Sequence, residues 1–160
     1  MVSESINTAI IVIAGIILAS MVSAMLLSQI SVIDSSMRLI IKSAQNKIST
    51  QISIVLVSIN TSTTKYFVIY AKNTGSRAIS QQELAQSDVY LQDSAKTILL
   101  LYSSSGGLGK WNYTESVQNG IWDVGETITI KAFNATSLSI PTRIVFVLPN
   151  GVSAEYQYTG

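Results

Sequence analysis

The feature that most constrains the fold is the apolar stretch from Ile6 to Ile33, which contains no charged residue. As a helix it would measure roughly 42 Å at 1.5 Å per residue, and a bilayer core needs about 20 apolar residues. A soluble helix of this length would need a polar face, which a few Ser, Thr, Gln and Asn residues do not provide. The stretch therefore predicts an N-terminal membrane-spanning helix over residues 1–33, tilted or with one end projecting.

A cleaved secretory signal is the alternative interpretation of this stretch. Such a signal has a basic segment followed by an apolar core of roughly 7–15 residues. Residues 1–5 contain no Lys or Arg, and the apolar core here is longer. We therefore expect a permanent anchor.

A row of small residues lies within the predicted span, where Gly15, Ala19 and Ser23 recur every four residues. Small side chains at this spacing allow two membrane helices to approach closely, so we hypothesise that the helix self-associates along this row. The alternative is that Gly, Ala and Ser occur here only because they are common in membrane helices.

The helical pattern continues beyond the span. Residues 34–51 contain no Gly or Pro, and apolar residues recur there at helical spacing: Met37, Ile40, Ile41, Ala44 and Ile48. We predict one helix from about residue 5 to about residue 50, in which residues 34–51 form an amphipathic extension like the stalk of a pilin-like protein. Its apolar stripe needs a partner, either the chain's own head domain or a neighbouring subunit.

From residue 52 onward the apolar period changes from 3.6 to 2, which indicates strands. The predicted strands are Ile52–Ile59, Tyr66–Ala71, Asp88–Gln92, Thr97–Tyr102, Trp111–Thr114, Glu126–Ala132, Arg143–Leu148 and Val152–Tyr158. Residues 81–86 predict a short helical turn or a loop. Such closely spaced short strands predict an all-β, immunoglobulin-like antiparallel β-sandwich over residues 52–160. A helix packed against one sheet, as in bacterial pilins, is the alternative.

The last two predicted strands flank Pro149, Asn150 and Gly151. Asn-Gly between two alternating runs is the strongest short-range signal of a β-hairpin. In the second run, alternate residues are expected to share one face of the sheet: Val152, Ala154, Tyr156 and Tyr158.

Catalytic chemistry is not expected from this sequence. The chain has no His and no Cys, which removes histidine bases, thiolates, disulfides and the usual zinc sites. Asp123 and Glu126 are too few carboxylates for calcium, so a β-turn with Gly125 is the preferred interpretation. The run Gly106–Lys110 lacks the spacing of a phosphate-binding loop. We predict no enzyme activity, no cofactor and no metal, and the net charge of +1 argues against a nucleic-acid partner.

The location of the head is indicated by two conflicting signals. N-glycosylation tripeptides begin at Asn60, Asn112 and Asn134 and favour an exported head. The N-terminal tail has no basic residue, whereas three follow the span: Arg38, Lys42 and Lys47. The positive-inside rule would therefore keep the head in the cytoplasm. We predict that the head lies outside, because a five-residue tail is easily retained in the cytoplasm. In addition, the rule describes ordinary juxtamembrane loops, and a pilin-like stem is not one of them.

Four motifs follow the apolar helix in a distinctive order. They are Tyr66–Ser76 with its Asn-Thr-Gly turn, Asp88–Leu91, Trp122–Ile128 with its Gly-Glu-Thr strand entry, and Arg143–Gly151 with its closing Pro-Asn-Gly hairpin. This order covers nearly the whole chain. It resembles the accessory membrane proteins F and G of the archaeal flagellum (archaellum), which are related to archaellins and archaeal pilins.

The resemblance implies an immunoglobulin-like head outside the cytoplasmic membrane and a structural, stator-like role. In that family, protein F is associated with binding the surface layer and protein G with assembly beside F. The implied partners are therefore copies of the same chain, the F/G partner, and the surface-layer protein. Archaellins and archaeal pilins carry a short basic leader, which residues 1–5 do not resemble. We therefore expect no prepilin-peptidase processing and a permanently anchored accessory protein, slightly closer to protein G.

Two other functions remain as alternatives. The first is a pilin-like or archaellin-like filament subunit, which predicts a trimmed N-terminus. The second is a membrane-tethered binding or chaperone-like module for sugars or exported proteins. That module would need a ligand pocket, and no sequence feature indicates one.

Overall fold

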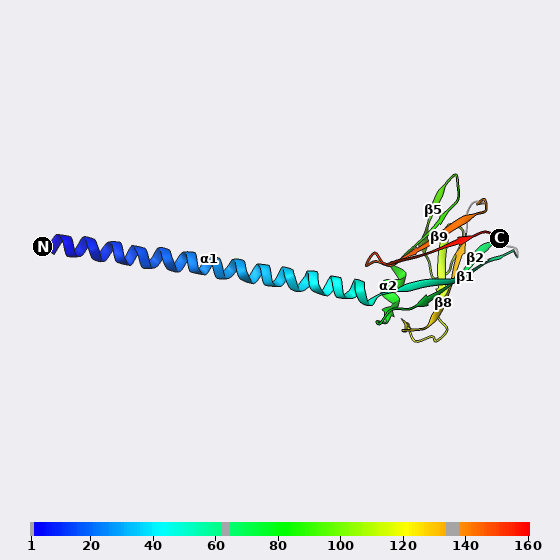
Figure 1. Cartoon of the computed structure of the whole chain (residues 1–160), viewed down its shortest axis with the longest axis horizontal. Helices are drawn as coiled ribbons and strands as arrows, with labels where there is room; N and C mark the ends of the chain where they lie inside the picture. The colour runs from blue at the N-terminus through cyan, green and yellow to red at the C-terminus, as the bar shows by residue number, and fades with distance from the viewer. Residues whose placement is uncertain (1, 62–64, 134–137) are drawn as a thin grey trace. The chain divides into compact units, whose positions relative to one another are not determined.

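The structure is a computed structural model of the chain that describes residues 2–61, 65–133 and 138–160. The chain forms two compact units, Met1–Ala44 and Gln45–Gly160. One α-helix, α1 (Val2–Ser49), makes up the first unit, and its last turn belongs to the second unit, which is otherwise a β-domain (Figure 1). The prediction of a single long helix followed by an all-β domain is confirmed.

Helix α1 is continuous because it contains no proline and only one glycine, Gly15. Glu4 lies in its first turn and Lys47 in its last turn, where each charge complements the helix dipole. Ser and Thr hydroxyls along the helix donate to carbonyls one turn earlier, as Ser20 Oγ does to Ile16 O at 2.8 Å. Their polar groups are therefore satisfied within the helix, which an apolar environment requires.

The β-domain contains ten strands and a one-turn helix among the described residues. They are β1 (Ile52–Asn60), β2 (Tyr66–Asn73), β3 (Ile79–Ser80), α2 (Gln81–Ala85), β4 (Asp88–Gln92), β5 (Thr97–Tyr102), β6 (Lys110–Thr114), β7 (Ile121–Trp122), β8 (Thr127–Phe133), β9 (Thr142–Val147) and β10 (Ser153–Tyr158). Eight of the strands form one sheet in the order β1-β2-β8-β6-β5-β4-β9-β10, and β3 pairs with β7.

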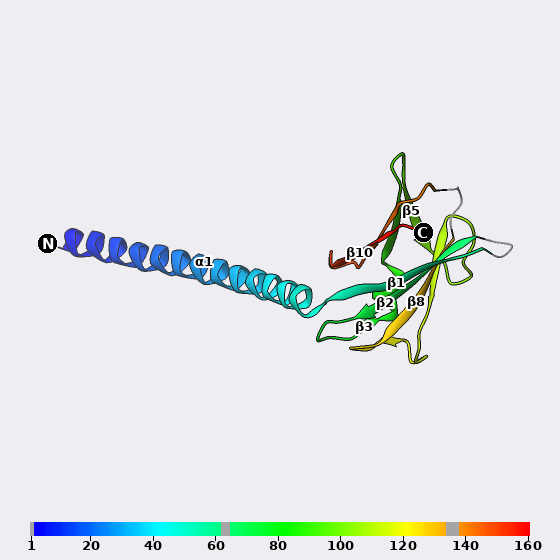
Figure 2. The ribbon, with the colours of Figure 1, turned by 45° about the vertical axis from the view of Figure 1, so that its right-hand side comes forward.

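The eight-stranded sheet curls until its two end strands meet (Figure 2). Strands β1 and β10 are in contact, and the rings of Phe67 on β2 and Tyr158 on β10 lie 5.8 Å apart, edge to face. Trp111 on β6 makes a similar edge-to-face contact across the interior with Phe146 on β9, at 5.6 Å. The two halves of the sheet therefore face one another around one core, which confirms the sandwich prediction in a nearly closed, barrel-like form.

Two features of the sheet differ from the prediction. Strands β5 and β6 pair in parallel, with Leu101 opposite Lys110 and Tyr102 opposite Trp111, whereas the other strand pairs of the described sheet are antiparallel. The seven-residue loop between them turns the chain back on itself so that β6 runs in the same direction as β5, and its three glycines adopt the positive φ that such a tight path requires. Strands β3 and β7 were not predicted, because two residues are too few to display a period of 2.

The core follows the alternation expected along each strand. On β8, the side chains of Ile128, Ile130 and Ala132 are fully buried, while their neighbours are only partly buried. Trp111 and Trp122 are the largest fully buried side chains. Burying one large aliphatic side chain stabilises a fold by about 1.5–3 kcal/mol, so this shared interior provides most of the head's stability.

The closing β9–β10 hairpin forms at the predicted turn. Gly151 has φ of 79°, and its N–H donates to Leu148 O at 2.9 Å. Asn150 Oδ1 accepts from Val152 N at 3.1 Å, which further fixes the turn. Along β10, Ala154 is buried between exposed neighbours, as the predicted face requires.

Candidate functional site

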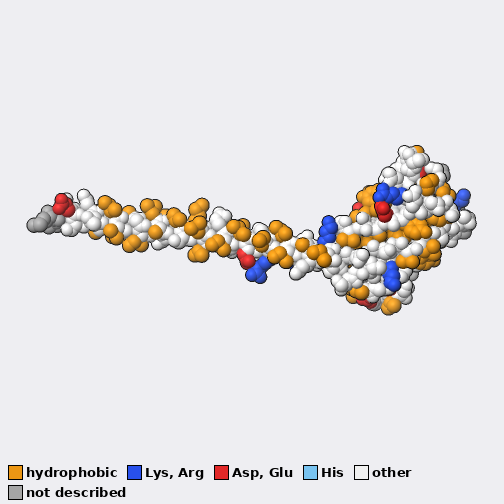
Figure 3. Space-filling view, viewed as in Figure 1, with side chains coloured by type: hydrophobic (Ala, Val, Ile, Leu, Met, Phe, Trp, Pro, Cys, Tyr) orange, Lys and Arg blue, Asp and Glu red, His pale blue; other side chains and the backbone are white. Residues whose placement is uncertain are grey.

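The apolar part of α1 is the first candidate functional surface. Within residues 2–61, 65–133 and 138–160, α1 is the one helix that is long and apolar enough to cross a membrane. Its large apolar side chains are exposed around the whole helix, and Figure 3 shows hydrophobic atoms along its visible length. A surface of this kind is unfavourable in water and favourable in lipid.

The predicted row of small residues lies on this exposed helix. Ser23 Oγ donates to Ala19 O at 2.8 Å, so this hydroxyl is already satisfied within α1. A side chain added at Gly15 would meet no atom within 4 Å, which leaves that position open to close approach by another helix. The three residues share one face, and self-association along it stays a prediction.

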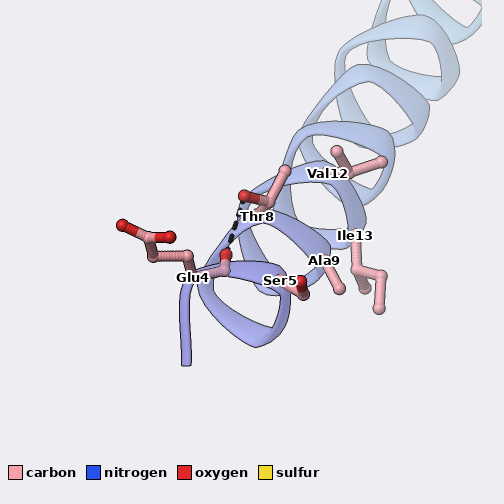
Figure 4. Close-up of a pocket in the computed structure, with 6 residues that line it drawn as sticks. All are labelled: Glu4, Ser5, Thr8, Ala9, Val12 and Ile13. Carbon is pink, nitrogen blue, oxygen red and sulfur yellow. Dashed lines mark hydrogen bonds between the residues drawn. The ribbon is translucent and has the colours of Figure 1, made fainter. Parts of the chain in front are cut away.

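A shallow hollow lies beside the first turns of α1 (Figure 4). All six lining residues come from this one helix: Glu4, Ser5, Thr8, Ala9, Val12 and Ile13. Thr8 Oγ1 donates to Glu4 O at 2.9 Å, so this hydroxyl is engaged within the helix. Among the described residues no second element supplies an opposite wall, so we do not regard the hollow as a ligand site.

The amphipathic extension carries both apolar and charged side chains on its surface. Met37, Ile40 and Ile41 are all more than half exposed, so the predicted stripe is available to a partner. Arg38 Nε donates to Asp34 Oδ2 at 2.9 Å, one turn apart, at the point where the uncharged stretch ends.

The last turn of α1 is joined to the head through Thr50, which is polar but buried. Its hydroxyl donates to Asn46 O at 2.5 Å and accepts from Arg77 Nε at 2.6 Å and Asn150 Nδ2 at 3.0 Å. These bonds connect the helix end, the segment after β2 and the β9–β10 turn. We call this network, together with Glu83, the stem–head junction; all of its residues lie in the second unit.

Arg77 is held in the junction by Glu83 of α2. Two hydrogen bonds join them, Nη2 to Oε1 at 2.7 Å and Nη1 to Oε2 at 3.1 Å. Glu83 also receives the Ser80 N–H at 3.1 Å, while its own N–H donates to Ser80 Oγ, which completes a capping box. The Ser-x-x-Glu spacing is a sequence signal for this helix start, where residues 81–86 alone predicted only a short helical turn or a loop.

The hydrogen bond from Arg77 holds the pKa of Glu83 below its usual range, with burial acting in the opposite direction. A carboxylate with a lowered folded-state pKa stabilises the fold at pH values above its unfolded pKa of about 4.3. This contribution is lost as the pH falls through the folded-state pKa. The junction is therefore fully formed near neutral pH and weakens only in strong acid.

Close backbone packing reinforces the junction at Gly75. Ser76 N–H donates to Ser49 O and Thr74 N–H donates to Gln51 O, both at 2.9 Å. A Cβ at Gly75 would lie only 2.5 Å from Ser49 O and 2.6 Å from Gln51 N. Since both atoms belong to the backbone, only glycine allows this approach.

Replacing Thr50 by Val is expected to lower the free energy of unfolding of the head by about 1–3 kcal/mol, because Arg77 and Asn150 lose a buried acceptor. Thermal unfolding followed by near-ultraviolet circular dichroism, which reports the tryptophans of the head, measures this change. Thr129→Val on β8 is the matched control, since Thr129 is only half-buried and no junction bond involves it. Equal stabilities for the two variants would contradict the role of Thr50.

The Asp123–Glu126 segment forms the predicted turn. Glu126 N–H donates to Asp123 O at 3.1 Å, and Gly125 has φ of 82°. The two carboxylate oxygens of Glu126 accept from the N–H groups of Val117 at 2.9 Å and Asp123 at 3.0 Å. Glu126 is therefore used to hold the turn, and no group of three or more acidic side chains suited to a metal occurs among the described residues.

The glycine-rich run Gly106–Lys110 is a structural loop. Its backbone amides are engaged within the head, with Gly109 N–H donating to Phe133 O at 2.9 Å and Lys110 N–H to Gly107 O at 3.0 Å. A phosphate loop presents free amides to its ligand. These engaged amides cannot bind a phosphate, which agrees with the prediction that the run is not a phosphate-binding loop.

The structure places two of the three predicted glycosylation asparagines. Asn60 ends β1 and is half-buried, with Nδ2 donating to Tyr66 Oη at 3.0 Å. Asn112 lies within β6, and its buried Oδ1 has no hydrogen-bond partner among the described residues. Asn134 lies outside the described residues. The asparagines are on different elements, and glycosylation stays a prediction.

An apolar surface covers the outer side of β5 and its neighbours. Leu99 lies opposite Tyr90, which in turn lies opposite Val145, so the three form a row across β5, β4 and β9. Leu101 continues this surface and is 60% exposed. We call Leu99, Leu101, Tyr90 and Val145 the β5 face. The end strands β1 and β10 contact one another, so their edges are less open to a partner protein. The β5 face is therefore the more accessible surface for such a contact.

Comparison with known proteins gives matches to structural proteins of archaeal motility. The structure is similar to the archaellum periplasmic stator protein FlaG from Sulfolobus acidocaldarius, with 26% identity, a TM-score of 0.54 and coverage of 68% of this chain and 99% of that chain. It is also similar to a chain of the periplasmic FlaF–FlaG stator complex from the same organism, with 27% identity, a TM-score of 0.53 and coverage of 68% and 89%. No curated protein matches the sequence.

A family match extends this similarity to the helix. The sequence matches the model of the archaeal-type flagellin family over residues 3–158, a range that includes nearly all of α1 and all ten strands. The predicted resemblance to the archaellum accessory proteins and their relatives is thereby confirmed. Because the match includes both the apolar helix and the β-domain, the chain belongs to the archaeal-type flagellin family.

Proposed function

We propose that this chain is a membrane-anchored structural component of the archaellum machinery with a stator-like role. The observation that carries the proposal is an apolar helix of membrane-spanning length joined to a head similar to the periplasmic stator protein FlaG. Membership of a family of structural proteins confirms the prediction that the chain is not an enzyme. Its action is therefore mechanical and depends on protein–protein contacts.

The proposed topology has a single membrane pass. Residues 1–33 span the membrane, residues 34–51 extend the stem, and residues 52–160 form a head outside the cytoplasmic membrane, beneath the surface layer. The periplasmic location of the similar FlaG supports this orientation. The first ion pair after the span, Asp34 with Arg38, suits the membrane–water boundary.

The stem–head junction gives the proposed mechanical role a physical basis. A rotating filament needs a fixed counterpart, and a force on the head reaches the membrane only through the end of α1. Thr50 receives hydrogen bonds from two separate segments of the head, and Gly75 permits direct backbone packing against the helix end. Bonds from several directions resist bending at this point better than one flexible linker.

The proposed partners are a second copy of the chain, an F/G-type accessory protein and the surface-layer protein. The FlaF–FlaG complex of a similar protein supports an accessory partner. The β5 face provides an apolar surface for such a contact. Gly15, Ala19 and Ser23 provide a row for self-association within the membrane.

The test is co-sedimentation of the full chain in lipid nanodiscs with purified surface-layer protein and, separately, with an F/G-type accessory protein. We expect binding to at least one of them, and Leu101→Ser is expected to weaken it because the side chain lies on the β5 face. Val55→Ser on β1 is the control, since Val55 is similarly exposed at 57% but lies on another strand. If the chain binds neither protein and forms long fibres alone, the proposal fails.

A filament subunit is the second candidate function. The observation that favours it is the family match, which extends through the helix that would pack in a filament core. Electron microscopy of the purified chain and sequencing of the N-terminus of the cellular protein separate the two functions. Fibres together with a trimmed N-terminus would identify a filament subunit. An N-terminus at Met1 together with the absence of fibres would identify an accessory protein.

A further inference from the structure

Strand β5 has two sides, and β4 occupies one of them along its length. The hairpin between the two strands is closed by Asp93 N–H, which donates to Lys96 O at 3.0 Å. Backbone groups in an antiparallel pair point alternately toward the partner strand and away from it. The even-numbered residues of β5 therefore direct their N–H and C=O groups to β4, whereas Thr97 and Leu99 direct theirs to the opposite side.

Strand β6 occupies only the end of that opposite side. It pairs with Leu101 and Tyr102 of β5, and Leu101 N–H donates to Gly109 O at 3.4 Å. In the part of the chain that the structure describes, no strand pairs with this side of Thr97 and Leu99. Their N–H and C=O groups therefore point outward from the β4–β5 hairpin, which projects from the rest of the head (Figures 1 and 2).

The sequence of this strand has none of the devices that keep strand edges apart. Residues 97–102 read Thr-Ile-Leu-Leu-Leu-Tyr, without a charged residue, Pro or Gly. Natural edge strands usually carry Lys, Pro or a bulge, because an open row of N–H and C=O groups pairs readily with another strand. The Leu99 side chain is exposed as well. We call Thr97–Leu100 the β5 edge.

The other strand edges of the head are covered, bulged or shorter. Strands β1 and β10 contact one another, and β1 is bulged between Ile54 and Leu56. Strands β3 and β7 contain two residues each. Strand β6 is open only over Asn112–Thr114, which lead directly to Glu115. Among the described residues, the edge that best matches the β5 edge is therefore the same edge of a second copy.

We propose that the β5 edges of two copies pair with each other, antiparallel, across a two-fold axis. Ile98 lies opposite Ile98 of the second copy, which places Thr97 opposite Leu99 on both sides of the axis. Each Thr97–Leu99 pair exchanges two backbone hydrogen bonds, so all the outward groups of both edges are satisfied. Charges do not oppose this register, because Lys96 lies opposite the uncharged Leu100.

Membrane anchoring makes so short an interface sufficient. Two copies held in the same membrane have a high effective concentration, so few new bonds are needed to pair their heads. The inference rests in this respect on the proposed function, and it specifies how a second copy binds. The two fail separately, because membrane extraction tests the anchor and co-sedimentation tests the contacts with other proteins.

Cysteine cross-linking tests the register, because the chain has no Cys of its own. Thr97→Cys and Leu99→Cys are introduced separately into the full chain, which is reconstituted in liposomes at a low protein-to-lipid ratio and oxidised with copper phenanthroline. In the proposed register, position 97 lies about 5.5 Å from position 99 of the second copy, Cα to Cα, which a disulfide can bridge. Like positions lie about 7–8 Å apart, at or beyond the limit. The two variants mixed should therefore form at least about fivefold more disulfide-linked dimer than either variant alone.

A proline at position 99 tests the backbone bonds themselves. The Leu99 N–H points away from β4, so Leu99→Pro removes only an outward donor, and proline is tolerated on such edges. Leu99→Ala is the matched control, because it shortens the same side chain and keeps the N–H. Both are combined with Ile98→Cys, whose thiol lies at the two-fold axis. Leu99→Pro should lower the dimer yield about tenfold relative to Leu99→Ala, because each dimer loses two backbone bonds.

Near-ultraviolet circular dichroism checks that each head is folded, and the exposed variants at positions 97 and 99 test the proposal even if the proline variant is not. Three results would overturn it: no cross-link from the mixed variants, equal yields from the mixed and single variants, or equal yields from folded Leu99→Pro and Leu99→Ala proteins. The first result would leave the β5 edge to a strand of a different protein.

Discussion

Replacing Leu18 and Val22 together by Asp is expected to release the chain from the membrane. Both side chains are more than half exposed and lie one turn apart near the middle of the uncharged stretch. An Asp at the centre of a spanning helix costs about 2.5–3.5 kcal/mol, so two cost roughly 5–7 kcal/mol. Fractionation of cell membranes followed by alkaline carbonate extraction measures how much of the protein remains membrane-integrated.

The matched control places the same substitutions outside the predicted span. Met37 and Ile41 are also one turn apart and similarly exposed, but they belong to the extension. Met37→Asp with Ile41→Asp should leave the chain in the membrane fraction. If the Leu18 and Val22 variant stays in that fraction as well, α1 does not anchor the protein through residues 1–33.

Trp122→Ala is expected to cause the largest loss of stability in the head. The side chain is fully buried, and its ring lies 6.3 Å from that of Phe146. Its Nε1–H donates to Glu126 O at 3.0 Å, and its carbonyl accepts from Asn73 Nδ2 at 3.1 Å. Removing a buried Trp typically costs about 3–5 kcal/mol, which lowers the Tm by roughly 10–25 °C for a domain of this size.

Ile121→Ala is the control for this substitution. Ile121 is the other residue of β7, but its side chain is 42% exposed, so the expected loss is below about 1 kcal/mol. Thermal unfolding of both variants provides the comparison. Similar losses would mean that the Trp122 interior is not the main source of stability.

Most of the fold was predictable because its signals are local. The uncharged run predicted the helix. Runs with a period of 2 predicted β4 and β5, and the predicted bounds of these two strands equal those in the structure. The Asn150–Gly151 turn gave the last hairpin. In each of these elements, a pattern within a short window determines the structure.

The parts that were missed depend on contacts between distant segments. The stem–head junction joins Thr50 to Asn150, which are 100 residues apart in the chain. The parallel β5–β6 pairing depends on how the glycine loop packs against Phe133, where a Cβ at Gly106 would lie 2.6 Å from the ring. No pattern in a single sequence encodes such contacts.

The central claim is a single-pass anchor with an external head, and cysteine accessibility tests it most directly. The chain has no Cys, so a membrane-impermeant maleimide reports only an introduced thiol. Ser3→Cys marks the start of α1, and Ser153→Cys marks an exposed position on β10. In intact cells, the account predicts labelling at residue 153 and labelling at residue 3 only after lysis. The reverse pattern, or labelling of both in intact cells, would contradict it.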